Sequence, residues 1–217
     1  TLDGGAGNDH VSYQNAQGVA LNVNFAAGTI TGGDNDGSIL TVFDVESAAG
    51  TNLGDFFTAS SSTPVNGLRT DPIQSFQGME GNDTILGAQG GAQNLPRVTL
   101  LEYTDSTAGV IVNLSASSIV VGSDTVPGNR ARDGFGGTDQ FTDIDGVRGS
   151  AHDDYLSGGG FGFISFGLHS EYFEGMGGND TIDGGEINGG HGLASYEHSE
   201  GAVIVNFGED TVASGGV

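Results

Sequence analysis

Acidic side chains follow glycine-rich runs at three places in this chain. The decapeptide at residues 2–11, LDGGAGNDHV, recurs at residues 76–85 as FQGMEGNDTI and at residues 173–182 as FEGMGGNDTI. Glycine reaches positive φ and leaves its carbonyl free to turn toward a ligand, and the aspartate adds a carboxylate. An all-oxygen set of ligands of this kind suits a hard cation, and calcium fits it best. Each copy therefore predicts a turn and then a short strand, whose apolar residue two places after the aspartate points inward.

The decapeptide resembles the nonapeptide of the hemolysin-type (RTX) calcium-binding repeats. The resemblance implies a parallel β-roll or β-helix, in which the first six residues of each repeat form a calcium-binding turn and the last three a short strand. It also implies carbonyl and carboxylate ligands at Gly4, Ala6, Gly7 and Asp9, at Gly78, Glu80, Gly81 and Asp83, and at Gly175, Gly177, Gly178 and Asp180. Met79 and Met176 depart from the family pattern at its second glycine, and the copies do not follow one another in tandem.

Looser forms of the same turn extend the expected ligand set. Residues 50–55 keep the glycine and the aspartate, and residues 149–154 fall on them without a gap when Asp143 is aligned with Asp44. Degenerate glycine turns at residues 32–37 and 134–139 add two more. The carboxylates expected to bind calcium are Asp9, Asp36, Asp55, Asp83, Asp139, Asp154 and Asp180.

Composition limits the class of protein. The 217 residues include 41 glycines, 28 acidic residues and only five basic ones, which gives a net charge of −23. Glycine without a three-residue period excludes collagen, and the acidity argues against nucleic acid and anionic membranes as direct partners. The chain has no cysteine and therefore no disulfide. With no apolar run of about 18 residues, we expect no direct membrane insertion.

An alternating pattern predicts half-buried strands. It occupies residues 19–25 and returns at residues 110–114 and 203–207, each time after a tyrosine. The side chains expected to point inward are Val19, Leu21, Val23, Phe25, Val110, Val112, Leu114, Val203, Val205 and Phe207. An asparagine stands before the last apolar residue of each copy, and it forms either a stacked amide ladder or an outward polar position.

No stretch keeps a helical apolar period, so we expect an all-β fold, a right-handed parallel β-solenoid (β-roll or β-helix) with loop insertions. It would form one array over residues 1–217, with units 1–74, 75–171 and an incomplete 172–217. Proline-bearing segments 60–71, 88–97 and 123–132 are expected as loops. Segment 158–168, rich in phenylalanine and glycine, is either a buried rung or an exposed aromatic binding loop.

Stacking gives calcium a structural role. Successive turns would bring carboxylates within about 5 to 7 Å, where each pair repels by roughly 2 to 3 kcal/mol at an effective dielectric constant near 20. A divalent cation between the turns would attract both carboxylates and replace this repulsion by a net attraction. Folding is therefore expected to be coupled to calcium binding.

The five histidines are scattered and no catalytic motif is present, so we expect no enzymatic activity. The leading interpretation is a structural or adhesive module of a secreted or cell-surface bacterial protein, cut from a longer chain. Its partners would be calcium ions and, end to end, other copies or neighbouring repeats. The alternative is a calcium-stabilised accessory or secretion module of an exoenzyme such as a protease, a lipase or a polysaccharide-modifying enzyme. Ice binding ranks third, because no regular Thr-x-Thr ladder is present.

Overall fold

A computed structural model describes residues 1–16, 18–33, 37–61, 73–88, 98–159, 163–165, 168–185, 191–199, 202–206 and 211–214. Throughout these residues the regular secondary structure is strand, as expected for an all-β chain, and none is helix. The described part accordingly contains no helix that could cross a membrane.

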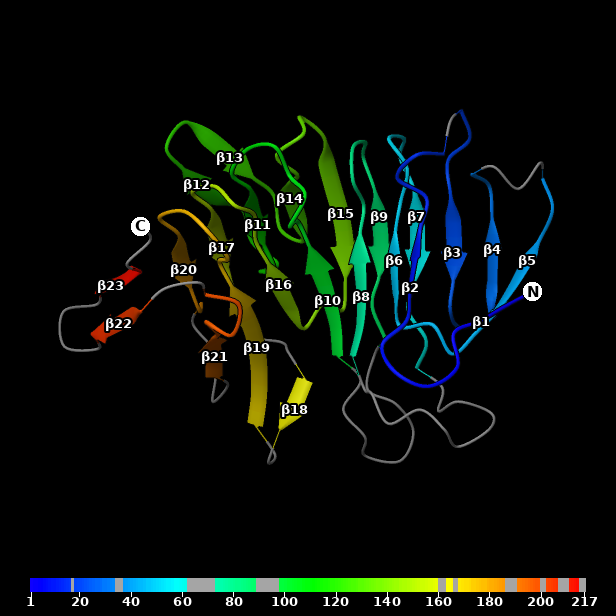
Figure 1. Cartoon of the computed structure of the whole chain (residues 1–217). Helices are drawn as coiled ribbons and strands as arrows, with labels where there is room; N and C mark the ends of the chain where they lie inside the picture. Colours follow the sequence, from blue (N-terminus) through cyan, green and yellow to red (C-terminus); the bar gives the residue numbers. More distant parts are fainter. Residues whose placement is uncertain are drawn as a thin grey trace.

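Most strands belong to two sheets, which Figure 1 shows running side by side from the N-terminal to the C-terminal end of the molecule. The larger sheet has eleven strands, in the order β1-β5-β4-β3-β7-β9-β15-β14-β11-β17-β20. Their bounds are β1 (Leu2–Asp3), β3 (Asn22–Asn24), β4 (Thr29–Thr31), β5 (Leu40–Phe43), β7 (Phe56–Thr58), β9 (Thr84–Leu86), β11 (Ile111–Asn113), β14 (Arg130–Arg132), β15 (Thr138–Thr142), β17 (Tyr155–Ser157) and β20 (Thr181–Asp183).

The second sheet has eight strands. Its main path is β18-β19-β16-β10-β8-β6-β2, and β21 also pairs with β19. Their bounds are β2 (His10–Ser12), β6 (Ser47–Ala49), β8 (Ile73–Gln77), β10 (Val98–Glu102), β16 (Gly146–Arg148), β18 (Phe163–Ser165), β19 (Leu168–Glu174) and β21 (His191–Ala194). Two small sheets pair β12 (Ile119–Val121) with β13 (Asp124–Val126), and β22 (Val203–Asn206) with β23 (Thr211–Ser214).

The chain alternates between the two large sheets. It passes from β6 to β7, from β8 to β9, from β16 to β17 and from β19 to β20, each time from the eight-stranded to the eleven-stranded sheet. Neighbouring strands reached in this way pair in parallel, for example β7 with β9 and β17 with β20. A short turn connects the sheets at each of these crossings, so equivalent turns stack at one edge of the molecule.

Antiparallel meanders interrupt the parallel pattern. Strands β3, β4 and β5 form one, and β11, β14 and β15 form the other. Part of the second meander, β14, lies with β13 in segment 123–132, which the sequence predicted as a loop. That prediction is wrong for residues 124–126 and 130–132, because β13 pairs with β12, and β14 pairs with β11 and β15. Residues 127–129 form the turn between β13 and β14.

The core lies between the two sheets. Most described strands of the two sheets contribute an inward apolar residue, and strand register aligns these residues into rows. In the larger sheet one row contains Val23, Phe57, Ile85 and Phe141, and a second contains Ala131, Val112 and Leu156. The row of the smaller sheet contains Ala48, Phe76, Leu101, Val147 and Phe173. Phe76 contacts both Phe25 and Phe57, with ring centroids 5.3 Å apart in each pair. Burying each of the valine, leucine, isoleucine and phenylalanine side chains in these rows contributes roughly 1.5 to 3 kcal/mol.

The predicted alternation holds for most of its members. Leu21, Val23, Val110, Val112 and Leu114 are buried, and Phe25 packs against the core. Val19 is 53% exposed, so its inward placement was wrong, because the strand begins only at Asn22. In the third copy Val203 belongs to the separate β22–β23 sheet and is half-buried, while the side chains of Val205 and Phe207 lie outside the described residues.

The two aspartates on which the sequence alignment of the units is based share an unusual backbone conformation. Asp44 and Asp143 both take left-handed conformations, with φ of 47° and 55°. The repeated asparagines, in contrast, have local roles. Asn113 Nδ2 donates to the carbonyls of Ser117, Val126 and Pro127, and Asn24 Oδ1 accepts the N–H of Ala27. Neither side chain forms an amide ladder.

Candidate metal centre in a row of buried aspartates

Aspartates occupy the position two residues before the inward apolar residue on five strands of the larger sheet. We call Asp55, Asp83, Asp139, Asp154 and Asp180 the aspartate row. It has two parts that β14 and β11 separate: Asp55, Asp83 and Asp139 are in register at the start of β7, β9 and β15, and Asp154 and Asp180 are in register at the start of β17 and β20. Side chains two apart on a strand share a face, so these carboxylates point toward the interior with the core residues. Asp83, Asp139 and Asp55 are only 0%, 1% and 2% exposed. Leu21 and Val110 hold the same position on β3 and β11, where no carboxylate occurs.

Each carboxylate is fixed by the backbone of the neighbouring strand. Asp83 Oδ1 accepts the N–H of Asp55 at 2.7 Å, and Asp139 Oδ1 accepts the N–H of Asp83 at 3.0 Å. Asp180 Oδ1 accepts the N–H of Asp154 in the same way, at 3.0 Å. The row therefore links successive turns through side-chain to main-chain hydrogen bonds, in addition to the strand pairing that follows them.

For four aspartates of the row, all except Asp139, the carboxylate requires glycine five residues earlier. A Cβ at Gly78 would lie 2.1 Å from Asp83 Oδ2, and one at Gly175 would lie 2.1 Å from Asp180 Oδ2. The looser turns match, with 2.3 Å between a Cβ at Gly50 and Asp55 Oδ2 and 2.2 Å between one at Gly149 and Asp154 Oδ2. The repeated glycine-to-aspartate spacing thus has a steric reason that does not depend on a ligand.

Three carboxylates and a tyrosine gather where β9, β15 and the turn before β15 meet. Tyr103 Oη donates to Asp139 Oδ2 at 3.1 Å, and Asp133 Oδ1 accepts the N–H groups of Phe135, Gly136 and Gly137 at 2.8 to 2.9 Å. Asp133 is fully buried, as Asp83 is. The Oδ2 atoms of Asp83 and Asp133 are buried without a hydrogen-bond partner. We call Asp83, Asp133, Asp139 and Tyr103 the acidic cluster.

Burial makes the carboxylates of the aspartate row hard to ionise. It raises the pKa of Asp83 to about 9, with the charge of Asp139 adding to the effect. Burial also raises the pKa of Asp139 to about 7, and there the charge of Asp133 adds. The pKa of Asp180, which is less buried, is raised to about 6, and those of Asp55 and Asp154 are raised as well, chiefly by burial. Without a counter-cation, Asp83 therefore holds a proton at neutral pH, and Asp139 titrates close to neutral pH.

The first decapeptide is placed differently from the other two. Its strand β2 pairs with β6 in the eight-stranded sheet, whereas β9 and β20 belong to the eleven-stranded sheet. Asp9 consequently lies at the opposite edge of the core, where its N–H donates to Glu46 Oε2 at 2.9 Å. A second row of polar residues continues from there along the smaller sheet, through Glu46, Gln74, Thr99, Asp145 and Glu171, all buried.

The glycine and other turn residues expected to bind calcium are divided between the same two edges. Gly78, Glu80 and Gly81 lie with Asp83, and Gly175, Gly177 and Gly178 lie with Asp180, whereas Gly4, Ala6 and Gly7 stay with Asp9 at the other edge. The side chain of Glu80 is exposed. Asp36 lies outside the described residues.

Asp133 and Tyr103 were not anticipated as site residues. A signal existed for both, because Asp133 opens the glycine run that Asp139 closes, and Tyr103 is one of the tyrosines that precede each alternating strand. In the described residues, no group of three or more His, Asp or Glu side chains has the arrangement of a metal site. A cation in the acidic cluster would therefore require its carboxylates to rotate out of their present hydrogen bonds.

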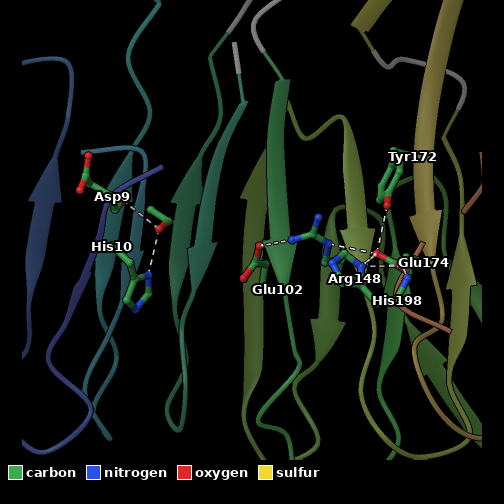
Figure 2. A network of polar contacts seen from close by, with 8 residues as sticks. Asp9, His10, Glu102, Arg148, Tyr172, Glu174 and His198 are labelled. Atoms are coloured by element: carbon green, nitrogen blue, oxygen red, sulfur yellow. Dashed lines mark hydrogen bonds and ion pairs between the residues drawn. The ribbon is translucent and has the colours of Figure 1, made fainter. Parts of the chain in front are cut away.

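A second polar network lies on the smaller sheet and is centred on Arg148 (Figure 2). Its guanidinium donates to Glu102 at 3.0 Å through Nη1 and to Glu174 at 3.1 Å through Nε. Glu174 also accepts hydrogen bonds from Tyr172 Oη and from the backbone N–H of His198, and its Oε1 lies 2.9 Å from His198 Nδ1. Burial by itself would raise the pKa of Glu174, but the hydrogen bonds from His198 lower it. This network joins β10, β16 and β19 to the segment after β21.

The sequence was compared with known protein families and with curated proteins, and it matches no family model and no curated protein.

Proposed function

We propose that this chain is a calcium-binding repeat module of the RTX type, with a structural or adhesive role in a secreted or cell-surface bacterial protein. Its fold would be a right-handed parallel β-solenoid with inserted meanders. The alternation of the chain between two mostly parallel sheets supports such a solenoid, and the net charge of −23 supports a cation as the natural partner.

The observation that carries the proposal is the acidic cluster. Three carboxylates share one buried region, and two of their oxygens have no hydrogen-bond partner. Burying an ionised carboxylate without a partner is costly, and it is normally avoided by protonation, by pairing or by a metal ion. None of the ion pairs among the described residues involves these carboxylates. A divalent cation would supply the missing charge and replace the protons.

Calcium fits the donor set, because carboxylates and turn carbonyls are the oxygen ligands that it prefers. Asp83, Asp133 and Asp139 would provide the carboxylates. When bound, the ion would supply charge neutralisation and rigidity, and its affinity would add to the stability of the folded state.

The proposal is tested by calorimetric titration of the chelator-treated chain with calcium, combined with thermal unfolding. At a calcium concentration of 100 times Kd, the free energy of unfolding should rise by about 2.7 kcal/mol per site. Asp83→Asn and Asp133→Asn should each lose most of that gain. Asp124→Asn, which removes an exposed carboxylate from β13, is the matched control and should keep it.

The calcium-free measurement separates a metal ligand from a purely structural aspartate. Asparagine retains an acceptor oxygen for the N–H of Asp55 but removes the buried acid, so Asp83→Asn should be as stable as the parent chain in chelator at pH 8, or more stable. If calcium in the millimolar range leaves unfolding unchanged and Asp83→Asn is destabilised in every buffer, the cluster is a structural hydrogen-bond centre and the proposal is wrong.

A further inference from the structure

Strands β9 and β20 begin within the same sequence, Asn-Asp-Thr-Ile, at residues 82–85 and 179–182. The turns before them also match. Gly81 and Gly178 have φ of 129° and 108°, and a Cβ on either would lie 2.5 to 2.6 Å from the carbonyl of the preceding turn. Met79 and Met176, two residues earlier, share φ of 73° and 70°. The two strands are therefore structural equivalents and not merely similar in sequence.

Strands β9 and β20 make equivalent hydrogen bonds along one edge. The N–H of Thr84 donates to the carbonyl of Asp55 at 2.9 Å, and the N–H of Thr181 donates to that of Asp154 at 2.8 Å. The matching side-chain bonds, from the N–H of Asp55 to Asp83 Oδ1 and from the N–H of Asp154 to Asp180 Oδ1, complete the correspondence.

The other edge of β9 holds β15 in parallel. Gln140 pairs with Thr84 and Phe141 with Ile85. The N–H of Gln140 donates to the carbonyl of Asp83 at 2.8 Å, while the N–H of Asp83 donates to Asp139 Oδ1 at 3.0 Å.

Two side chains of the Asn-Asp-Thr-Ile segment add specificity to that pairing. Asn82 Oδ1 accepts the N–H of Thr138 at 2.8 Å, and Gln140 Nε2 reaches Thr84 Oγ1 at 2.7 Å. Asn82 and Thr84, which accept these bonds, recur as Asn179 and Thr181.

The corresponding edge of β20 is open among the described strands, since β20 ends the eleven-stranded sheet. Ile182 is only partly buried, whereas its equivalent Ile85 is 1% exposed. Asn179 and Thr181, the counterparts of Asn82 and Thr84, are exposed. An edge with unpaired backbone groups is a template for a further strand.

We propose that the free edge of β20 is a docking site for one parallel strand of the β15 type, supplied by a further repeat unit. The occupant is an extended Gly-Thr-Asp-x-Phe segment, with its aspartate two residues before an inward aromatic residue. The aspartate of the docked segment would accept the N–H of Asp180. The backbone N–H of the residue after this aspartate would donate to the carbonyl of Asp180, and the phenylalanine ring would cover Ile182. The inference does not depend on calcium, because it rests on strand pairing that the chain already shows at β9.

The test uses the full chain, extended after Val217 by a flexible Gly/Ser linker and a second copy of segment 136–143, Gly-Gly-Thr-Asp-Gln-Phe-Thr-Asp. A tether of this kind raises the effective concentration of the strand to the millimolar range. The backbone amides of Asp180 and Ile182 face the free edge, and their hydrogen exchange should slow by roughly five- to tenfold or more, the factor that one net hydrogen bond gives. The free peptide at millimolar concentration should slow the same amides.

Two matched variants locate the effect. Asn179→Ala with Thr181→Ala removes the two side-chain acceptors of β20 and should abolish most of the protection. Asn82→Ala with Thr84→Ala makes the same change on β9 and should leave the protection of β20 intact. An appended segment in which the aspartate and the phenylalanine are replaced by alanine and serine should protect neither amide. Unchanged exchange at Asp180 and Ile182 in the extended chain would overturn the proposal, as would protection that survives the β20 substitutions. The measurement is made in chelator and in calcium, so that failure of calcium binding is scored separately.

Discussion

Asp83 Oδ1 accepts the backbone N–H of Asp55 at 2.7 Å, although the two residues are 28 positions apart in the chain. The bond joins one glycine turn to the next and fixes the carboxylate beneath Gly78. One aspartate thus shapes its own turn and holds the neighbouring turn in register. The remaining oxygen, Asp83 Oδ2, is buried without a hydrogen-bond partner, and the proposed role of a cation rests on this atom.

Without calcium, the stability of the protein should fall as the pH rises. Burial raises the pKa of Asp83 to about 9 and that of Asp139 to about 7, whereas an aspartate in the unfolded chain titrates near ~3.9. Between these values the folded chain retains protons that the unfolded chain has released, so each increase in pH favours unfolding. Melting temperatures in chelator, measured from about pH 4 to about pH 9, should decrease throughout, and calcium should remove most of the decrease.

A comparison of variants separates this effect from general charge repulsion. Asp83→Asn should flatten the pH profile in chelator, whereas Asp124→Asn should leave its slope unchanged because that carboxylate is exposed. Stability that rises between pH 5 and pH 8 in chelator would contradict the assignment of buried, protonated carboxylates.

Two glycines of one turn should respond differently to substitution by alanine. A Cβ at Gly175 would lie 2.1 Å from Asp180 Oδ2, whereas at Gly177 the nearest atom is 3.5 Å away and φ is not positive. Gly175→Ala should therefore reduce the free energy of unfolding by about 1 to 3 kcal/mol, the usual cost of overpacking. Gly177→Ala should change it by less than about 0.5 kcal/mol. Urea unfolding of the two variants measures the difference, and equal effects would mean that the carboxylate does not require the glycine.

Arg148 should stabilise the smaller sheet through Glu174, whose side chain is 2% exposed. Arg148→Met removes the cation and leaves that carboxylate with Tyr172 and His198 alone. We expect a loss of about 1 to 3 kcal/mol, in the range for hydrogen bonds to charged groups. Arg132→Met, at an exposed arginine on β14, is the control and should cost less than about 0.5 kcal/mol.

The Arg148 effect should also depend on pH. Hydrogen bonds from His198 hold the pKa of Glu174 below its usual value despite burial. Stabilisation by this carboxylate is thus complete above the unfolded-state pKa, about 4.3, and is lost as the pH falls through the lower folded-state value. Unfolding curves of the parent chain and Arg148→Met should converge in strong acid, and a difference that persists there would assign the effect to packing alone.

Replacing Met176 by glycine should relieve backbone strain, because Met176 has a positive φ. Its φ is 70°, a region that costs an ordinary residue roughly 1 to 2 kcal/mol, and its side chain is 37% exposed. Met176→Gly should leave stability unchanged or raise it by up to about 1 kcal/mol, because the greater entropy of the unfolded glycine offsets part of the gain. Met176→Val should lose at least about 1 kcal/mol, because a β-branched residue resists positive φ. Thermal unfolding of the pair tests the order, which the opposite result would refute.

The sequence by itself determined the local features of this protein. Glycine and aspartate at fixed spacing set the turns, period-two alternation set strands such as Asn22–Asn24 and Ile111–Asn113, and the gap-free match of Asp44 with Asp143 identified equivalent backbones. These features depend on residues close together in the chain, where conformational preference and side-chain period act directly. For the same reason, the absence of a helical period predicted an all-β chain.

Only the tertiary structure decided which turns share an edge. The first decapeptide matches the others in sequence, yet Asp9 lies at the opposite edge from Asp83, because β1 enters the molecule on the larger sheet whereas β8 lies in the smaller one. The cluster of Asp83, Asp133 and Asp139 likewise depends on how a meander inserts between repeats, which brings together carboxylates 50 and 56 positions apart from Asp83. Local sequence fixes the shape of each turn. Which neighbour it meets is set by the pairing of strands over long chain distances, through hydrogen bonds that any backbone can make.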